Sequence, residues 1–273
     1  MSDVEWKSCA AFRELHAPGR ILLLPNAWDA GSARIIAEAG APAIATTSAG
    51  VAWGHGYADG DRLPTAKLLA TVSEIVRVLR VPLSVDIEAG YSDEPAKVGE
   101  LVRALADAGA AGLNIEDGAG SPDLLVAKIE AAKNATVRAG VEVFVNARAD
   151  VLLRGLVPAE RALPEVLARV ARYRAAGCDG IFVPRLVAPA DIGAVVAAAA
   201  PLPLNVLAGA GLAPAPELRA LGVRRVSAGS LIAAAVLGVA SRLAGEFLAD
   251  GRGDSLLGGG VDYGTINRML ARV

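Results

Sequence analysis

The sequence contains few residues of the kinds that build redox, zinc or disulfide sites. It has two cysteines, Cys9 and Cys178, and two histidines, His16 and His55, in 273 residues. Two cysteines are too few for a disulfide framework or a thiolate metal centre, and two histidines are too few for a zinc aldolase. We therefore expect both cysteines to be structural and any metal to be bound through oxygen atoms.

The chain also lacks a strong charge of either sign and a membrane-directed segment. Its formal net charge is -2, with acidic and basic residues interspersed, so no broad basic surface is expected. The amino terminus, MSDVEWKSCAAF, has no signal-peptide pattern, and no uninterrupted apolar run approaches the ~18 residues of a membrane span. These absences predict a cytoplasmic protein with neither a nucleic-acid nor a membrane partner.

What the chain does contain is a regular alternation of short apolar runs with longer, alanine-rich and charged segments. This alternation is typical of β-α units around a parallel sheet. Prolines lie near the expected helix starts, and glycines follow several expected helix ends. Eight apolar runs are present, at 21–27, 43–50, 82–90, 112–118, 143–150, 180–186, 203–209 and 224–230. We predict an α/β fold, a parallel (β/α)8 TIM barrel that forms a single domain over residues 1–273.

The expected strands begin with apolar residues, and most of them end with polar ones. In a barrel of parallel strands these ends lie at one face, which is where such enzymes keep their active sites. The polar strand ends are Asn26, Thr46 to Ser48, Asp86, Glu88, Glu116, Asp117, Asn146, Arg148 and Asn205. The active site is therefore expected at this face.

Three carboxylates stand out among these residues. Asp86 and Glu88 are two positions apart and so project from the same side of one strand, while Glu116 ends the next strand. Clustered carboxylates repel one another unless a cation lies among them. With oxygen ligands only, the site suits Mg²⁺, with Mn²⁺ as a second possibility. Alternatively, Asp86 and Glu88 bind loop amides or pair with arginines.

The remaining polar strand ends offer groups for an anionic substrate. Asn146 and Arg148 share one side of their strand, and arginine pairs with carboxylates through two hydrogen bonds, although a structural salt bridge is the alternative role. The segment containing Ser48, Ala49 and Gly50 offers a hydroxyl and backbone N–H groups, and Asn205 adds an amide. We treat all six as candidate substrate-binding residues, together with Asp86.

Several motifs, taken in order, resemble the isocitrate lyase and phosphoenolpyruvate mutase superfamily. They are LLLPNAWDAGSARI, ATTSAG followed by GYADGD, SVDIEAGY, GLNIEDG, VNARAD, IFVP and PLNVLAG, and they span roughly residues 21–230. The resemblance implies a barrel whose eighth helix is exchanged with a partner subunit, commonly in a tetramer that is a dimer of dimers. It also implies a Mg²⁺ ion that holds a 2-oxo acid or its enolate.

The resemblance assigns roles to individual residues of this sequence. Asp86 matches the direct metal ligand, and Glu88, Glu116 and Asp59 match acids that hold the metal's waters. Arg148 matches the substrate-binding arginine, and 48–50 matches the segment that binds the substrate's carboxylate or phosphoryl group. We name Asp59, Arg148 and His55 as candidate catalytic residues, although His55 has the alternative of being a surface imidazole.

The sequence departs from the family pattern at the residues that distinguish the family's lyases from its mutases. No cysteine lies between Glu116 and Arg148, whereas the isocitrate and methylisocitrate lyases of the family carry a catalytic cysteine there. The Lys and Asn of the mutases' gating loop are absent as well. We therefore predict a Mg²⁺-dependent lyase or hydrolase that acts on the C–C bond of a small 2-oxo or 2-hydroxy acid resembling oxaloacetate, through a metal-stabilised enolate. A phosphonomutase-type enzyme and a non-catalytic 2-oxo acid binding protein are the alternatives.

The carboxyl-terminal part predicts an assembly. Residues 231–249 are alanine-rich and apolar over several turns, which indicates a helix. Because the family exchanges this element, we expect 231–273 to pack on a neighbouring subunit of a homo-oligomer.

Overall fold

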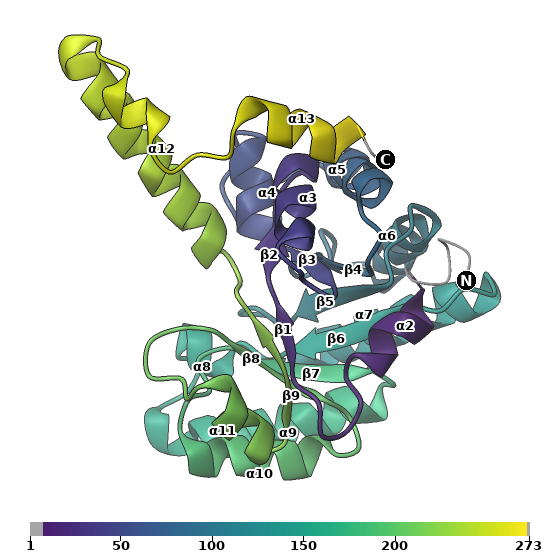
Figure 1. The fold of residues 1–273 in the computed structure, drawn as a ribbon. Coiled ribbons are helices and arrows are strands. Elements are labelled where there is room, and N and C mark those ends of the chain that lie inside the picture. The colour runs from purple at the N-terminus through teal and green to yellow at the C-terminus, as the bar shows by residue number, and fades with distance from the viewer. Residues whose placement is uncertain (1–7, 272–273) are drawn as a thin grey trace.

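The computed structural model describes residues 8–271 and shows a parallel β-barrel surrounded by helices (Figure 1). All neighbouring strands are parallel, in the order β1-β9-β8-β7-β6-β5-β4-β3-β2. The strands are β1 (Leu22–Leu24), β2 (Asn26–Ala27), β3 (Ile44–Thr46), β4 (Leu83–Asp86), β5 (Gly112–Glu116), β6 (Phe144–Arg148), β7 (Gly180–Val183), β8 (Leu204–Leu207) and β9 (Val223–Ser227).

Nine strands close into a barrel of eight units because β1 and β2 are two halves of one strand. They are separated by Pro25, which has no backbone N–H to donate to a neighbour. β1 pairs with β9 and β2 pairs with β3, so the split strand joins the two ends of the sheet. The predicted (β/α)8 barrel is confirmed, and a strand overlaps each of the eight predicted apolar runs.

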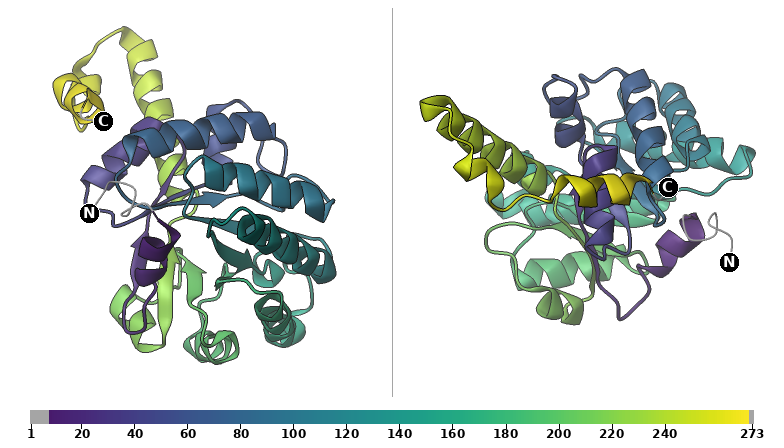
Figure 2. Two further views of the ribbon diagram at one scale, coloured as in Figure 1. Left: turned by 90° about the vertical axis from the view of Figure 1, so that its right-hand side faces the viewer. Right: turned by 45° about the horizontal axis from the view of Figure 1, so that its top comes forward.

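Helices follow the strands and cover most of the barrel (Figure 2). They are α2 (Cys9–Glu14), α3 (Ala30–Glu38), α4 (Ser48–Gly54), α5 (Thr65–Val78), α6 (Pro95–Asp107), α7 (Pro122–Arg138), α8 (Val151–Arg154), α9 (Ala159–Ala175), α10 (Pro189–Ala199), α11 (Ala215–Ala220), α12 (Leu231–Asp250) and α13 (Tyr263–Ala271), with a short 3-10 turn η1 (Asp254–Leu257). One boundary differs from expectation: the run 43–50 leaves the sheet after Thr46, and Ser48 already begins α4.

The apolar core has two parts. The larger lies between the strands and the surrounding helices, and it includes the outward-facing Val85, Ile115 and Ile181. The smaller fills the amino-terminal end of the barrel, where Phe12 of α2 packs on Phe144. Because that end is closed by aromatic side chains, the opposite, carboxyl-terminal end is where a ligand can enter.

The helix after the last strand does not cover its own barrel. Figure 1 shows α12 projecting away from the strands, and Ala233 is its one fully buried residue. The outer face of β1 and β9 is left open, so Leu23 is 54% exposed. After α12 the chain turns back, and α13 contacts α3 of the same chain.

Candidate functional site

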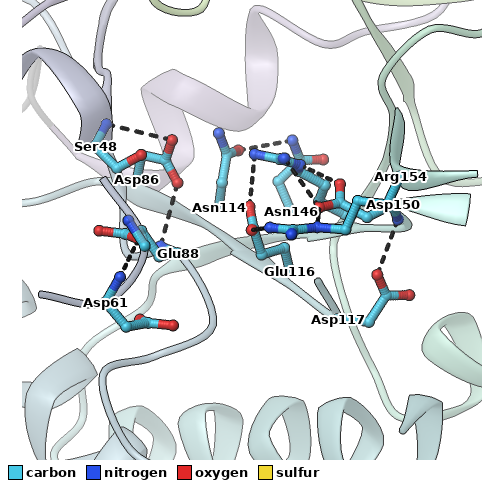
Figure 3. A network of polar contacts seen from close by, with 12 residues as sticks. Ser48, Asp61, Asp86, Glu88, Asn114, Glu116, Asp117, Asn146, Asp150 and Arg154 are labelled. Carbon is cyan, nitrogen blue, oxygen red and sulfur yellow. Dashed lines mark hydrogen bonds and ion pairs between the residues drawn. The ribbon is translucent and has the colours of Figure 1, made fainter. Parts of the chain in front are cut away.

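The carboxyl-terminal ends of β3 to β6 bring the predicted polar residues to one mouth of the barrel. Figure 3 shows Asp86 beside Ser48, with Glu116, Asp150 and Arg154 across the mouth from them. Asp86 ends β4, Glu116 ends β5 and Arg148 ends β6, and Glu116 is the direct register partner of Arg148. Alternation along each strand is what aims these side chains at the barrel axis.

Asp86 is a half-buried carboxylate that forms no ion pair with any residue in 8–271. Its side chain accepts two long hydrogen bonds, from the backbone N–H of Ser48 at 3.5 Å and of Glu88 at 3.3 Å. The Thr46 hydroxyl accepts the Asp86 N–H at 2.8 Å and fixes the end of the strand. Burial raises the pKa of Asp86, although the positive charge of Arg148 opposes that effect. A cation placed here would relieve the cost of burying this charge.

Glu88 is held by the loop that follows β3 and α4. One of its oxygens accepts the N–H of Gly60 at 2.7 Å and the N–H of Asp61, and the other accepts the Tyr91 hydroxyl at 3.0 Å. Glu88 itself has a left-handed backbone, with φ of 50°. The alternative of a carboxylate that binds loop amides is therefore what the structure shows for Glu88.

Arg148 lies in a partly buried cluster of charges. Its guanidinium contacts Glu116 at 2.5 Å and both oxygens of Asp150, at 2.6 Å and 3.1 Å. Arg154 contacts Asp150 at 2.9 Å and Glu116 at 3.4 Å. Burial raises the pKa of Glu116 to about 8, and Arg148 opposes that effect, while Glu116 and Asp150 raise the pKa of Arg148. Three N–H groups of Arg148 are thus engaged, and a guanidinium has five to offer.

Two candidate substrate-binding amides lie deeper inside the barrel than expected. Asn146 donates to Asn114 at 2.8 Å, and Asn205 accepts from Ser227 at 3.1 Å; both asparagines are 1% exposed. Arg225 joins the two by donating to Asn114 and Ser227, each at 3.1 Å. These side chains form a hydrogen-bonded layer inside the barrel, next to its carboxyl-terminal mouth.

The other predicted residues lie around the mouth or outside it. Asp59 is exposed, and its charge raises the pKa of Asp86 and of Glu88, which places it near the carboxylates. His55 follows α4 and contacts the Thr71 hydroxyl at 2.9 Å on the exposed surface. Ala49 and Gly50 are buried in α4, and a side chain at Gly50 would collide with Thr47 and Trp28. Packing alone therefore requires glycine at position 50.

The donor set fits a hard divalent cation at Asp86. Within residues 8–271 no three Asp, Glu, His or Cys side chains are grouped closely enough to hold a metal by themselves. The structure thus does not bring Asp86, Glu88 and Glu116 to one point, because loop amides hold Glu88 and arginines hold Glu116. An ion bound directly by Asp86 alone, with water as its other ligands, is compatible with this arrangement and with the preference of Mg²⁺ for retained water.

The comparison with known protein families agrees with this geometry. The family model described as phosphoenolpyruvate phosphomutase matches residues 12–248. The chain belongs to this family. Its membership of the isocitrate lyase and phosphoenolpyruvate mutase superfamily, and with it the prediction that it is an enzyme, is confirmed.

Relatives of this family member differ in the activity assigned to them. An uncharacterized protein of Mycobacterium tuberculosis is 39% identical over 225 residues, covering 81% of this chain and 82% of its own. A crystal structure from Burkholderia cenocepacia, provisionally assigned as a phosphonomutase, has a TM-score of 0.81 at 42% identity and covers 87% of this chain and 99% of that one. The 2-methylisocitrate lyase of Salmonella typhimurium is 30% identical over 180 residues, 63% of this chain and 60% of that enzyme.

Sequence reasoning missed several residues that build the site of this family member. Asp150 lies in VNARAD, two positions after Arg148, and the alternation of one strand could have placed it beside that arginine. Tyr91 and Asp61 could not be found in this way, because their contacts with Glu88 depend on left-handed loop conformations. Arg154 was hidden because α8, which carries it, is only four residues long.

Asp117 holds the backbone of Asp150, a residue of the site, and we expect the loss of Asp117 to destabilise the fold. It is fully buried and accepts the Asp150 N–H at 2.8 Å, Arg169 at 2.8 Å and the Tyr173 hydroxyl at 2.5 Å. Asp117→Ala leaves three buried donors without this acceptor, and we expect a loss of about 3 kcal/mol or more in the free energy of unfolding. Urea unfolding measures this.

The exposed pair of Asp123 and Arg172 provides the matched control for that measurement. Asp123→Ala should cost less than about 1 kcal/mol, because exposed ion pairs contribute little. Equal losses in the two variants would show that the contacts of Asp117 do not carry the stability assigned to them.

Proposed function

We propose that the chain is a Mg²⁺-dependent lyase or hydrolase that acts on the C–C bond of a small 2-oxo or 2-hydroxy acid. The observation that carries this proposal is Asp86, a half-buried carboxylate that faces the Ser48 amide and has no ion pair among residues 8–271. Cation-binding and anion-binding groups thus lie side by side at the mouth. A chelating 2-oxo acid needs both.

The resemblance to the family indicates which residues would hold the ion. Asp86 would bind it directly, and Glu88, Glu116 and Asp59 would hold its waters. A bound Mg²⁺ supplies charge stabilisation for negatively charged substrate oxygens. Mn²⁺ fits the same oxygen ligands.

The chain's own groups would orient the substrate and share its developing charge. Ser48 offers a hydroxyl and a backbone N–H whose hydrogen bond to Asp86 is long, at 3.5 Å, and Arg148 has N–H groups that neither Glu116 nor Asp150 uses. When the bond at C3 breaks, negative charge develops on the C2 oxygen of a pyruvate-type enolate, and fixed N–H donors stabilise such an oxygen without reorganisation.

Two alternatives remain open to the same site. A phosphonomutase-type activity has the family description and the Burkholderia cenocepacia structure in its favour. A protein that binds 2-oxo acids without turning them over would keep Asp86, Ser48 and Arg148 and lack a proton donor.

Turnover measured with a panel of 2-oxo acids, 2-hydroxy acids and phosphonopyruvate separates these functions. At saturating Mg²⁺ we expect the protein to form product from an oxaloacetate-like acid faster than Mg²⁺ does without protein. After a chelator removes the Mg²⁺, we expect no product. Thermal stabilisation by a 2-oxo acid without product would identify a binding protein. Product from phosphonopyruvate alone would identify a mutase or a related phosphonate enzyme.

We also propose that α12 covers the barrel of a partner subunit in a dimer of dimers. Leu23, Ile35 and Val226 line an open apolar recess of about 800 Å³ on the outer face of β1 and β9. α12 is apolar and exposed, with Leu237 53% exposed, and its length and mean hydropathy of 1.7 would also suit a membrane span. We favour the partner subunit because each chain offers both an uncovered strip and a helix able to cover it.

Sedimentation of the purified chain tests this assembly. At micromolar concentration we expect an oligomer, and Leu237→Glu should shift it toward monomer because it places a charge in the apolar contact. Val137→Glu, at a 72% exposed position on α7, is the matched control and should leave the assembly unchanged. A wild-type monomer would refute the proposal.

A further inference from the structure

Four residues other than glycine in the described chain have left-handed backbones: Asp61, Glu88, Tyr91 and Arg185. Such conformations cost roughly 1–3 kcal/mol each and persist where the surroundings enforce them. The first three enforce one another. Asp61 N–H and the Tyr91 hydroxyl both donate to Glu88, and Tyr91 N–H donates to Asp61 at 3.0 Å. Their strain is offset by contacts within the protein.

Arg185 has no such compensation. Its φ is 64°, and it follows Pro184 in the turn directly after β7, a position at which glycine is preferred. Its side chain is exposed and forms no hydrogen bond or ion pair with any residue in 8–271. A guanidinium is therefore carried on a strained backbone without a partner inside the protein.

The position of Arg185 connects it with the candidate site. The guanidinium of Arg148 lies over the aromatic ring of Phe182 on β7, 5.7 Å from the centre of the ring. Arg185 is three residues beyond Phe182, so its Cα lies at most about 10 Å from that residue. It therefore lies at the same mouth, in the turn just after β7, the strand next to β6.

A recess of about 360 Å³ adjoins this arginine. Leu153, Arg185, Val187 and Leu207 contribute to its wall, from the segments that follow β6 and β7 and from the end of β8. The lining side chains other than arginine are apolar, and an ion pair is stronger beside apolar walls than in open water. The recess thus suits one anionic group at the end of a short carbon chain.

We propose that Arg185 binds the distal carboxylate of a four- or five-carbon dicarboxylic 2-oxo acid, whose 2-oxo acid end is held at Asp86, Ser48 and Arg148. This inference rests on the proposed function. The planar guanidinium matches a carboxylate through two hydrogen bonds, and binding supplies the partner that the strained residue lacks. Arg185 then determines specificity for diacids over monoacids of the same length.

Calorimetric titration with matched ligands in Mg²⁺ buffer tests this inference. The ligand pairs are 2-oxoglutarate with 2-oxopentanoate, and oxaloacetate with 2-oxobutyrate, which differ in the distal carboxylate. We expect wild type to bind the diacid of at least one pair 10-fold or more tightly than its monoacid. Arg185→Gly should remove that preference and, because glycine accepts the left-handed backbone, should not lower the melting temperature.

Two further variants complete the test. Arg185→Lys keeps the charge without the two-pronged geometry and should retain only part of the preference. Arg20→Gly removes an exposed arginine just before β1, at the opposite end of the barrel, and should leave the preference unchanged.

The outcomes separate this inference from the proposed function. If wild type binds diacids and monoacids equally, or if Arg185→Gly keeps the preference, the role of Arg185 is refuted while a 2-oxo acid site stands. If wild type binds no 2-oxo acid of either pair, the proposed function fails, and the inference fails with it.

Discussion

Asp86→Asn is expected to reduce Mg²⁺-dependent turnover by at least about 10²-fold, the scale on which losing a single charge-stabilising group acts. The substitution keeps the size of the side chain but removes the charge that would bind the ion. It also directs an amide toward the N–H groups of Ser48 or Glu88, which Asp86 now accepts. The fold should be unaffected, because no ion pair of the described chain includes Asp86. Steady-state kinetics measures the loss of turnover, and thermal unfolding measures whether the fold is unaffected.

Asp107→Asn is the matched control for this substitution. Asp107 is exposed at the carboxyl-terminal end of α6, contacts Arg103 at 3.0 Å, and lies before the start of β5, at the end of the barrel opposite the mouth. Its turnover should equal that of wild type. Unchanged turnover of Asp86→Asn at saturating substrate would instead remove Asp86 from the metal site.

Isocitrate and 2-methylisocitrate should be cleaved negligibly, although a 2-methylisocitrate lyase is among the relatives. No cysteine lies between Glu116 and Arg148, and the protein's two cysteines, Cys9 and Cys178, are both buried. Burial raises the pKa of Cys178 to about 12 and also raises that of Cys9, so neither resembles a reactive thiol. The loss of a positioned proton donor costs roughly 10²–10⁴-fold in rate.

Assays for glyoxylate from isocitrate, and for pyruvate from its methyl homologue, check this expectation. The family's own lyases serve as positive controls. Rapid formation of either product would mean that another group replaces the cysteine, and the assignment to a different branch of the family would be withdrawn.

The barrel was predictable from the sequence because its signals are local. Each strand is a short apolar run, and Gly40, Gly109, Gly177 and Gly222 adopt the left-handed φ expected after helix ends. The location of Asp86, Glu116 and Arg148 at one mouth was predictable as well, because each ends its strand and parallel strands all end on the same side of the barrel.

The partners of these residues were not predictable, because they depend on contacts between distant loops. Glu88 turns toward Gly60 and Tyr91 through a left-handed backbone, which strand alternation cannot indicate. Arg225 reads as an ordinary basic residue in RRVSAGS, yet it is 1% exposed inside the barrel, where burial lowers its pKa to about 9. Only closure of the barrel brings it to Asn114.

A crystal structure grown with Mn²⁺ and 2-oxoglutarate tests the central claim most directly, because the anomalous signal of Mn²⁺ locates the ion independently of the ligand. The account predicts an ion bound by the Asp86 carboxylate, with the 2-oxo acid end of the ligand beside the Ser48 amide and Arg148. An ion that occupies another group of carboxylates, or a ligand bound away from this mouth, would contradict it.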